Sequence, residues 1–279
     1  MADLASEMSN GGGTVVSRYG ALVRAGVRAE ISYRTSFVTM IVSNAIVTGL
    51  DLAALLVLLR RVDTLGGWTA RQVLLLYALS SLGFTLADVV VGSVDKVAEY
   101  VRTGAFDRLL VRPMSTLGQL LVERFEVRRV GRAVLPLVVF VVVVSSNNVV
   151  HWTLTKIVLV PILIVASGAL ASALFVATSS VAFWLVNSQE MANSFTYGGA
   201  FAAQFPAHIF GTWLRQVLLF LVPIAAANYL PAMYLLDAPN PLGVPRWLQP
   251  LGVLAALPIV AIATISWRTA NRRYQSTGS

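Results

Sequence analysis

Cysteine is absent from this chain of 279 residues, and histidine occurs only twice. The lack of cysteine excludes disulfide bonds and thiolate metal ligands, and it fits a protein of the cytoplasmic membrane. His151 and His208 lie far apart, with no carboxylate at a metal-binding spacing, so we expect both to be structural. The only two lysines, Lys96 and Lys156, do not follow a glycine-rich phosphate-binding loop. The sequence therefore predicts no metal, no cofactor and no nucleotide bound by this chain, and no enzymatic activity of its own.

Charge is also scarce. Only 12% of the residues are charged and 57% are hydrophobic, whereas soluble domains are roughly 25% charged. The mean hydropathy of +0.74 is typical of an all-α integral membrane protein surrounded by membrane lipids. The net charge of +8 is spread over short segments between apolar runs, which is how membrane topology is encoded. We therefore expect no nucleic-acid partner.

The N-terminal residues lack the basic and apolar segments of a cleaved signal peptide, so we expect the N-terminus to stay in the cytosol. Residues 1–13 are interpreted as a disordered tail, and residues 14–279 as a single transmembrane domain. Residues 14–34 carry four arginines among apolar residues, which predicts an interfacial helix. A simple cytoplasmic extension is the alternative.

Apolar runs predict six membrane spans, at about 35–59, 71–92, 133–150, 157–186, 191–208 and 247–267. Gly66 and Gly67 predict a tight turn between the first two spans. The polar residues 145–148 leave the outer end of the third span uncertain. In the fourth span, small residues at 167–169 and 171–173 predict close approach of another helix.

Residues 213–236 are apolar but interrupted, because Pro223 and Pro231 flank Asn228 and Tyr229. Two short helices that enter and leave on the same side, a re-entrant pair, would explain this pattern. With a re-entrant pair the cytoplasmic side carries 15 basic residues against 6 outside; with a full crossing the numbers are 13 and 8. The positive-inside rule favours the re-entrant pair, with both termini cytoplasmic.

Residues 93–132 hold eight of the 21 basic residues and form a predicted cytoplasmic loop. Residues 94–102 alternate between an apolar and a charged helical face, and Gly104 is expected to end that helix. A short apolar and charged segment, 106–110, follows and closes at Arg112 and Pro113. This arrangement is typical of a docking surface.

Two acids, Asp51 and Asp88, lie inside predicted spans, and Asn44 is a further polar residue there. Buried carboxylates in a membrane are costly and indicate function by default, so these three residues are candidates for a substrate path. The alternatives are helix-packing hydrogen bonds or, for Asp88, a side chain that reaches the cytosol. The two acids differ in depth by roughly 15 Å, so we do not expect them to pair.

The predicted topology resembles the permease subunits of type-2 ABC (ATP-binding-cassette) exporters. More specifically, Tyr33-Arg34, the run 99–113 and Pro223 with 228–232 are similar to a bacterial permease subfamily, and the resemblance covers about residues 15–270. Its most specific part is the run Gly-Ala-Phe-Asp-Arg-Leu-Leu-Val-Arg-Pro at 104–113.

The resemblance implies a permease that forms the path with a second, often non-identical, permease subunit. Two separate ATP-binding subunits would bind ATP and Mg²⁺ and drive export across the bacterial cytoplasmic membrane. It also implies a coupling helix with Phe106, Leu109 and Leu110 as apolar anchors. The alternative for Phe106 is that its ring only packs under its own turn. The ATPase-coupling residues would be Tyr100, Arg102, Gly104, Phe106, Asp107, Arg108, Leu109, Leu110, Arg112 and Pro113. Pro223, Asn228, Tyr229 and Pro231 would form an extracellular gate.

Two other functions stay open. A secondary transporter would need internal repeats and ionisable groups near the membrane midplane. A membrane enzyme acting on lipids would need a cluster of carboxylates or histidines at one interface. The sequence shows neither a convincing repeat nor such a cluster.

Overall fold

The computed structural model describes residues 34–111, 114–123, 127–146, 149–185 and 189–274. The predicted tail 1–13 and all of the predicted interfacial helix except Arg34 lie outside these residues, as do Arg112 and Pro113. Within the described chain, the fold is helical except for one two-stranded hairpin.

Long apolar runs form the longest helices. Helix α3 (Arg34–Arg61) covers the predicted first span, and α4 (Ala70–Val91) covers the second. Helix α9 (Leu154–Ser180) continues into a 3-10 turn, η3 (Val181–Phe183), and occupies the predicted fourth span. The predicted sixth span is occupied by a 3-10 segment, η6 (Gln249–Ala255), and α13 (Ala256–Arg273).

Two helices are shorter than the sequence predicts. Helix α8 (Val134–Ser145) has 12 residues and α10 (Gln189–Ala202) has 14, or roughly 18 and 21 Å at 1.5 Å per residue. In the described residues, four helices are long and apolar enough to cross a membrane, or five if a bent pair counts as one span. The six-span arrangement therefore stays a prediction.

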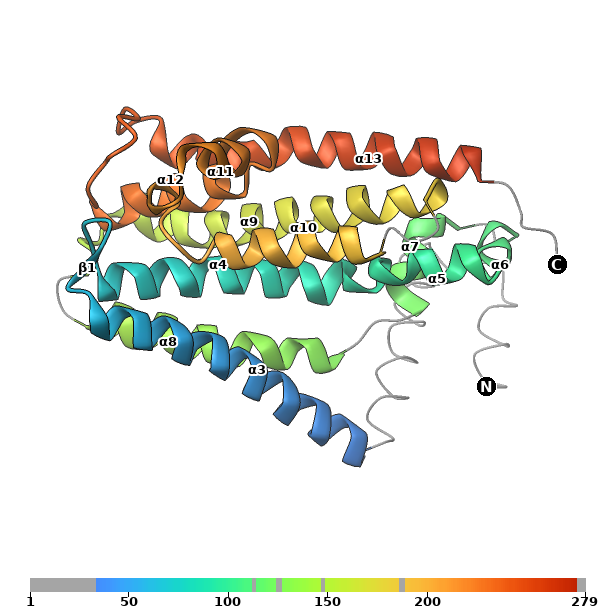
Figure 1. Ribbon diagram of the computed structural model, residues 1–279, viewed down its shortest axis with the longest axis horizontal. Helices are drawn as coiled ribbons and strands as arrows, with labels where there is room; N and C mark the ends of the chain where they lie inside the picture. The colour runs from blue at the N-terminus through green and yellow to red at the C-terminus, as the bar shows by residue number, and fades with distance from the viewer. Residues whose placement is uncertain (1–33, 112–113, 124–126, 147–148, 186–188, 275–279) are drawn as a thin grey trace.

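The long helices α3, α4, α8, α9, α10 and α13 run along the long axis of the molecule (Figure 1). At one end, the loop end, lie α5 (Val97–Arg102), α6 (Asp107–Leu110) and α7 (Thr116–Glu123). The 3-10 segments η1 (Gly92–Lys96) and η2 (Val127–Ala133) join this group to α4 and α8. The hairpin, α11 (Thr212–Gln216) and α12 (Ile224–Leu236) lie toward the other end, the hairpin end.

The turn between α3 and α4 is a short β-hairpin. Strand β1 (Thr64–Leu65) pairs antiparallel with β2 (Trp68–Thr69). Gly66 and Gly67 have φ angles of +61° and +84°, a left-handed conformation that glycine adopts without strain. The predicted tight turn is thus observed.

The close approach expected at residues 167–169 is also observed, and the partner helix is α4. A Cβ atom on Gly83 would overlap Ser167, and one on Gly168 would lie 2.9 Å from Leu86. The two helices therefore pack with their backbones nearly in contact, which only small residues permit. This α4–α9 contact forms the centre of the helix bundle.

The segment predicted as a re-entrant pair is sharply bent. Helix α11 passes into a π-helical turn, η5 (Val217–Leu221), and α12 follows at an angle of 95°. Before the pair, His208 Nε2 donates to the carbonyl of Gly66 in the hairpin, at 2.7 Å. After the pair, Asp237 forms an ion pair with Lys156 in the first turn of α9, at 2.6 Å. Both ends of the bent pair are thus held at the hairpin end of the molecule.

Candidate functional site

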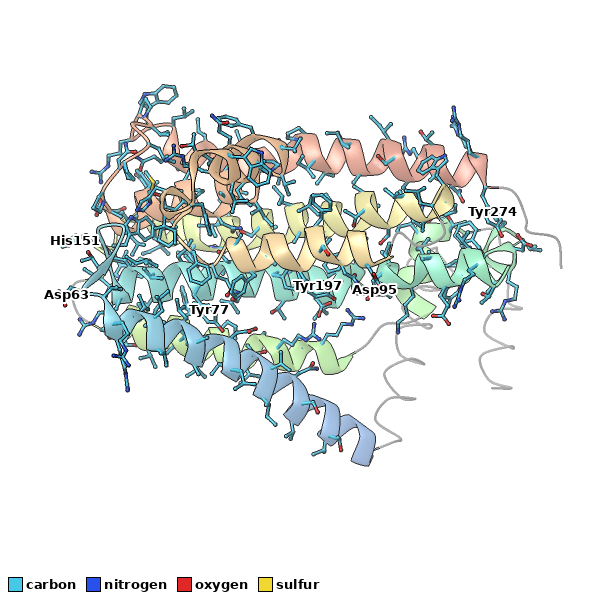
Figure 2. All side chains as sticks on the ribbon, in the orientation of Figure 1. Asp63, Tyr77, Asp95, His151, Tyr197 and Tyr274 are labelled. Carbon is cyan, nitrogen blue, oxygen red and sulfur yellow. The ribbon has the colours of Figure 1, made fainter. Side chains whose placement is uncertain are left out.

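The loop end is held to the bundle by an aromatic cluster around Phe106. The Phe106 ring is fully buried, and its centroid lies 5.0 Å from that of Phe183 and 4.9 Å from that of Tyr274. Burial raises the pKa of the Tyr274 phenol, and the nearby carboxylate of Asp107 raises it further. Figure 2 shows Tyr274 and Asp95 at this end of the molecule.

These contacts correct the anchor role expected for two residues. Phe106 and Leu109 lie in the core of this subunit, so neither side chain is exposed to another protein. The local fold explains this, because Gly104, at a φ of +68°, ends α5 and turns the chain back so that residue 106 enters the bundle. Tyr100 is buried in the same cluster. The carbonyl of Leu109 accepts a hydrogen bond from Gln119 of α7, at 2.8 Å.

The exposed face of the loop end consists of other residues of the same segment. Leu110 and Val111 are exposed by 45% and 86%, and they are the outward apolar side chains next to the buried Leu109. Arg102, Thr103 and Arg108 of the same segment are also exposed. The structure thus presents an outer face with two apolar and two cationic side chains. We call these five residues the loop-end face.

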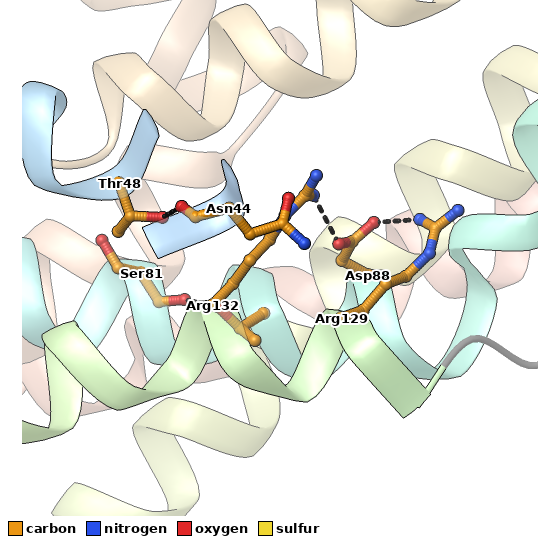
Figure 3. Close-up of polar contacts among 7 residues, drawn as sticks. Asn44, Thr48, Ser81, Asp88, Arg129 and Arg132 are labelled. Carbon is orange, nitrogen blue, oxygen red and sulfur yellow. Dashed lines mark hydrogen bonds and ion pairs between the residues drawn. The ribbon is translucent and has the colours of Figure 1, made fainter. Parts of the chain in front are cut away.

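A buried ion cluster lies where α4 meets the loop end (Figure 3). Asp88 is completely buried and pairs through Oδ1 with Arg129 and through Oδ2 with Arg132, the latter at 2.7 Å. Arg132 also donates from Nε to Asn44 Oδ1 of α3, at 3.2 Å. The cluster connects α3, α4 and η2. A single buried carboxylate between two guanidinium groups is the expected way to keep such charges inside a protein.

Gly92 makes room for this cluster, because a Cβ atom there would overlap the guanidinium of Arg129 and the carboxylate of Asp88. Sequence reasoning placed Arg129 and Arg132 in the cytoplasmic loop 93–132 and overlooked Gly92. The partners of Asp88 lie 41 and 44 residues away, so no local spacing indicates them. Of the alternatives for Asp88, the structure favours a packing contact, in the form of a buried ion pair.

Polar side chains continue from the cluster toward the middle of the molecule. On α3, Asn44, Thr48 and Asp51 share one face at spacings of four and three residues. On α4, Tyr77, Ser81 and Asp88 share a face at spacings of four and seven residues, and all three are buried. We call these six residues the polar seam. Asn44 and Asp88 are joined through Arg132, whereas Asp51 lies apart from them, as expected from its different depth.

A second polar group lies at the hairpin end. The hydroxyl of Tyr229 is 2.5 Å from His208 Nδ1, and the Tyr229 ring stacks on the buried Trp68 with centroids 5.2 Å apart. Deeper in the bundle, Asn228 Oδ1 accepts a hydrogen bond from Ser167, in the middle of α9. Pro231 is buried within α12, and Pro223 precedes its first turn. The four predicted gate residues therefore lie in α12 or at its start, in contact with the hairpin and α9.

His208 and Lys156 have structural partners, since His208 contacts Gly66 and Tyr229 and Lys156 pairs with Asp237. No group of three or more histidine, aspartate or glutamate side chains that could hold a metal ion occurs in the residues the structure describes. Lys156 is buried and pairs with Asp237, which also pairs with Arg246. These contacts hold the end of α12 against the start of α9.

The fold and these clusters define a multi-pass α-helical membrane protein with charged groups at the loop end. Comparison with protein families identifies it further. Residues 45–278 match the model of the ABC-2 family transporter protein, and because this match covers most of the chain, the protein belongs to that family. It is thus a type-2 ABC permease, the transmembrane component of a transporter that associates with ATP-binding subunits. Neither the curated proteins nor the solved structures gave a match.

Proposed function

We propose that this protein is the membrane-spanning permease subunit of an ATP-driven exporter. Two ATP-binding subunits bind it from the cytosol, and a second permease subunit, non-identical to this one, completes the translocation path. The observation that carries the proposal is the family match over residues 45–278. The separate, charged loop end supports it, because it offers a motor protein a defined surface on which to act.

The loop-end face is the docking surface for the ATP-binding subunit. Leu110 and Val111 take the role of apolar anchors, and Arg102 and Arg108 provide the polar rim. Phe106 acts indirectly in this scheme, because it fixes the face to η3 and to Tyr274 at the end of α13. A force on the face is therefore transmitted to the helices as a rigid-body movement.

The proposed topology has six crossings with both termini in the cytosol. The short helix α8 is preceded by seven residues of 3-10 helix, which add roughly 14 Å to its 18 Å. Helix α10 is continued by residues 203–209, which reach the hairpin at His208. Both segments then extend far enough to cross. The bent pair starts and ends on the outer side and forms the extracellular gate, since broken helices are tolerated at membrane depth only where they are buried in protein or line a water-filled cavity.

The polar seam is the proposed substrate path. It runs from the ion cluster at the loop end toward mid-depth, and its polar groups lie within helices that are otherwise apolar. Asp88 has a structural role in this path, since its charge is balanced by Arg129 and Arg132. Asn44, Thr48 and Asp51 are the members that can meet a passing molecule.

A co-purification experiment tests the docking surface. The tagged permease is purified from its own membranes, and the amount of ATP-binding subunit and the ATPase activity bound to it are measured. We expect Leu110→Glu with Val111→Glu to remove most of the bound ATPase, because a groove that accepts apolar anchors rejects two carboxylates.

The matched control is Val62→Glu, which adds a carboxylate at an exposed valine of the hairpin end. It should leave binding unchanged. Equal ATPase recovery with the double variant and the wild type would contradict the docking surface, and transport driven by an ion gradient without ATP would contradict the proposed function itself.

A further inference from the structure

One carboxylate of the polar seam has no opposite charge beside it. Asp51 lies in the middle of the candidate span Val42–Arg61 and is exposed at the surface of the described chain. It makes no ion pair with any described residue. The next charged residue along α3 is Arg60, nine positions away or roughly 14 Å. A carboxylate at this depth is costly unless something neutralises it.

Asp51 lies about one turn beyond Thr48 on α3, and Tyr77 lies about one turn from Ser81 on α4, both toward the hairpin end. The charge of Asp51 acts on the phenol of Tyr77, and the Ser81 hydroxyl lies next to that phenol. Ser81 Oγ is buried but makes no hydrogen bond of normal geometry within the described chain. Figure 3 shows the Ser81 side chain extending from α4 toward Thr48 of α3, and Figure 2 shows Tyr77 on the side of α4 that faces α3. A buried hydroxyl without a hydrogen-bond partner in the described chain is thus directed toward the face of α3 that also carries Asp51.

The chemistry of this group selects the ligand. An ionised carboxylate only accepts hydrogen bonds, and the two hydroxyl oxygens can accept as well, so the group has a surplus of acceptors. A protonated amine brings a positive charge and N–H donors, which satisfies both requirements at once. An anion would be repelled by Asp51. The exposed apolar side chains Val47 and Leu50, on the same part of α3, can contact an apolar body attached to the amine.

We propose that Asp51, Tyr77 and Ser81 form a mid-span binding site for the protonated amine of an amphipathic substrate. This inference rests on the proposed function, because it names the substrate class of the same path. Asp88 cannot serve in this way, since two arginines already neutralise it. Neutralisation of Asp51 by a basic residue of a second subunit, or by a proton, is the competing explanation, and in either case no amine would bind.

The test is equilibrium binding to the full chain, purified with its bound subunits and placed in lipid nanodiscs without ATP. Three radiolabelled probes with the same dodecyl chain are compared: dodecylamine, dodecyltrimethylammonium and dodecanol, each corrected for uptake by empty nanodiscs. We expect dodecylamine to bind most tightly, the trimethylammonium probe to bind more weakly because it has no N–H donors, and dodecanol to show no specific binding.

Variants locate the site. Asp51→Asn should weaken dodecylamine binding by roughly 10- to 100-fold, the range for a hydrogen bond to a charged group. Tyr77→Phe should weaken it by roughly 3- to 10-fold and leave the trimethylammonium probe unaffected. Asp51→Glu should retain binding, and the control Asp63→Asn, which removes an exposed carboxylate at the hairpin end, should match the wild type.

Equal binding of dodecylamine and dodecanol to the wild type would overturn the inference, and this comparison needs no variant to fold. Unchanged amine binding in Asp51→Asn would overturn it as well. Because the assay contains no ATP, its outcome is separate from that of the proposed function. ATP-driven transport without amine binding would contradict the amine site but not the proposed exporter function. Amine binding without any ATP-driven transport would contradict the exporter function but not the amine site.

Discussion

The two ends of the molecule each place one aspartate between two cations, but they bury it to different degrees. At the loop end, Asp88 is fully buried between Arg129 and Arg132. At the hairpin end, the side chain of Asp237 is 28% exposed, and of its partners Lys156 is buried whereas Arg246 is 69% exposed. The same arrangement of charges therefore contributes differently to the stability of the fold at the two ends. Water can replace Arg246 at the hairpin end, but it has much less access to the guanidinium of Arg129 beside Asp88, which is only 10% exposed.

The comparison also indicates that the ion cluster at the loop end is a rigid connection between helices, whereas the one at the hairpin end is adjustable. The Asp88 cluster joins α3, α4 and η2 directly below the loop end, where the proposed motor acts. The Asp237 contacts close the bent pair against α9, where a proposed gate must open. A buried cluster suits the transmission of movement, and a partly hydrated one suits an element that has to separate.

The largest effect is expected for Asp88→Asn. Removing the carboxylate breaks its ion pairs with the buried Arg129 and the partly exposed Arg132, which should cost about 3–5 kcal/mol of stability. Thermal unfolding of the purified permease, followed by size-exclusion chromatography, measures the loss. Asp63→Asn is the control because it removes an exposed carboxylate. A variant as stable as the control would show that the cluster is not a structural connection.

Gly92→Ala tests the same cluster without changing its charges. The added methyl group would overlap Arg129 and Asp88, so we expect a loss of about 1–3 kcal/mol in the same assay. Gly211→Ala provides the control, since a Cβ atom there meets nothing within 4 Å. Equal stability of the two alanine variants would contradict the packing described at Gly92.

Asp237→Asn should have an intermediate effect. It leaves Lys156 buried without its carboxylate, but the second partner is already in water, so the expected loss is about 1–3 kcal/mol. A loss as large as that of Asp88→Asn would remove the contrast between the two ends.

The smallest effect is expected for Arg246→Gln, at less than about 1 kcal/mol, because exposed ion pairs contribute little. The same substitution at the other end, Arg129→Gln, should cost several times more. High salt should weaken the Arg246 contact and leave the Arg129 contact nearly unchanged, since buried pairs are screened less. Equal losses for the two glutamine variants would show that burial does not determine the strength of these pairs.

The sequence predicted the helices with continuous apolar runs better than the interrupted ones. Helices α3 and α4 lie within two residues of the predicted bounds, because Arg60, Arg61 and two glycines mark the turn between them. Helix α10 ends at residue 202, six residues before the predicted bound, and the non-helical chain that follows is held by contacts no local pattern encodes. One such contact is the hydrogen bond from Ser80 to the carbonyl of Ala203, 2.8 Å long and 123 positions apart.

The candidate sites, too, could be predicted only where a local sequence pattern indicates them. Asn44 and Asp51 could be found because polar residues stand out in an apolar span, and the spacing of Thr48 between them could have revealed the shared face. The role of Phe106 could not be read correctly, because a short segment of apolar and charged residues has the same sequence pattern whether its aromatic ring points outward or into its own subunit. Only the contacts with Phe183 and Tyr274, 77 and 168 positions away, decide it.

The absence of cysteine allows a direct test of the central claim, that the loop-end face lies in the cytosol and contacts the ATP-binding subunit. Single cysteines are introduced at Val111 of the loop-end face and at Asp63 of the hairpin end, and intact cells are treated with a membrane-impermeant maleimide before cross-linking of isolated membranes. We predict that Val111→Cys escapes the maleimide and cross-links to an ATP-binding subunit, whereas Asp63→Cys is labelled from outside and does not cross-link. Labelling of Val111→Cys in intact cells, or a cross-link only from Asp63→Cys, would contradict the proposed orientation and with it the mechanism.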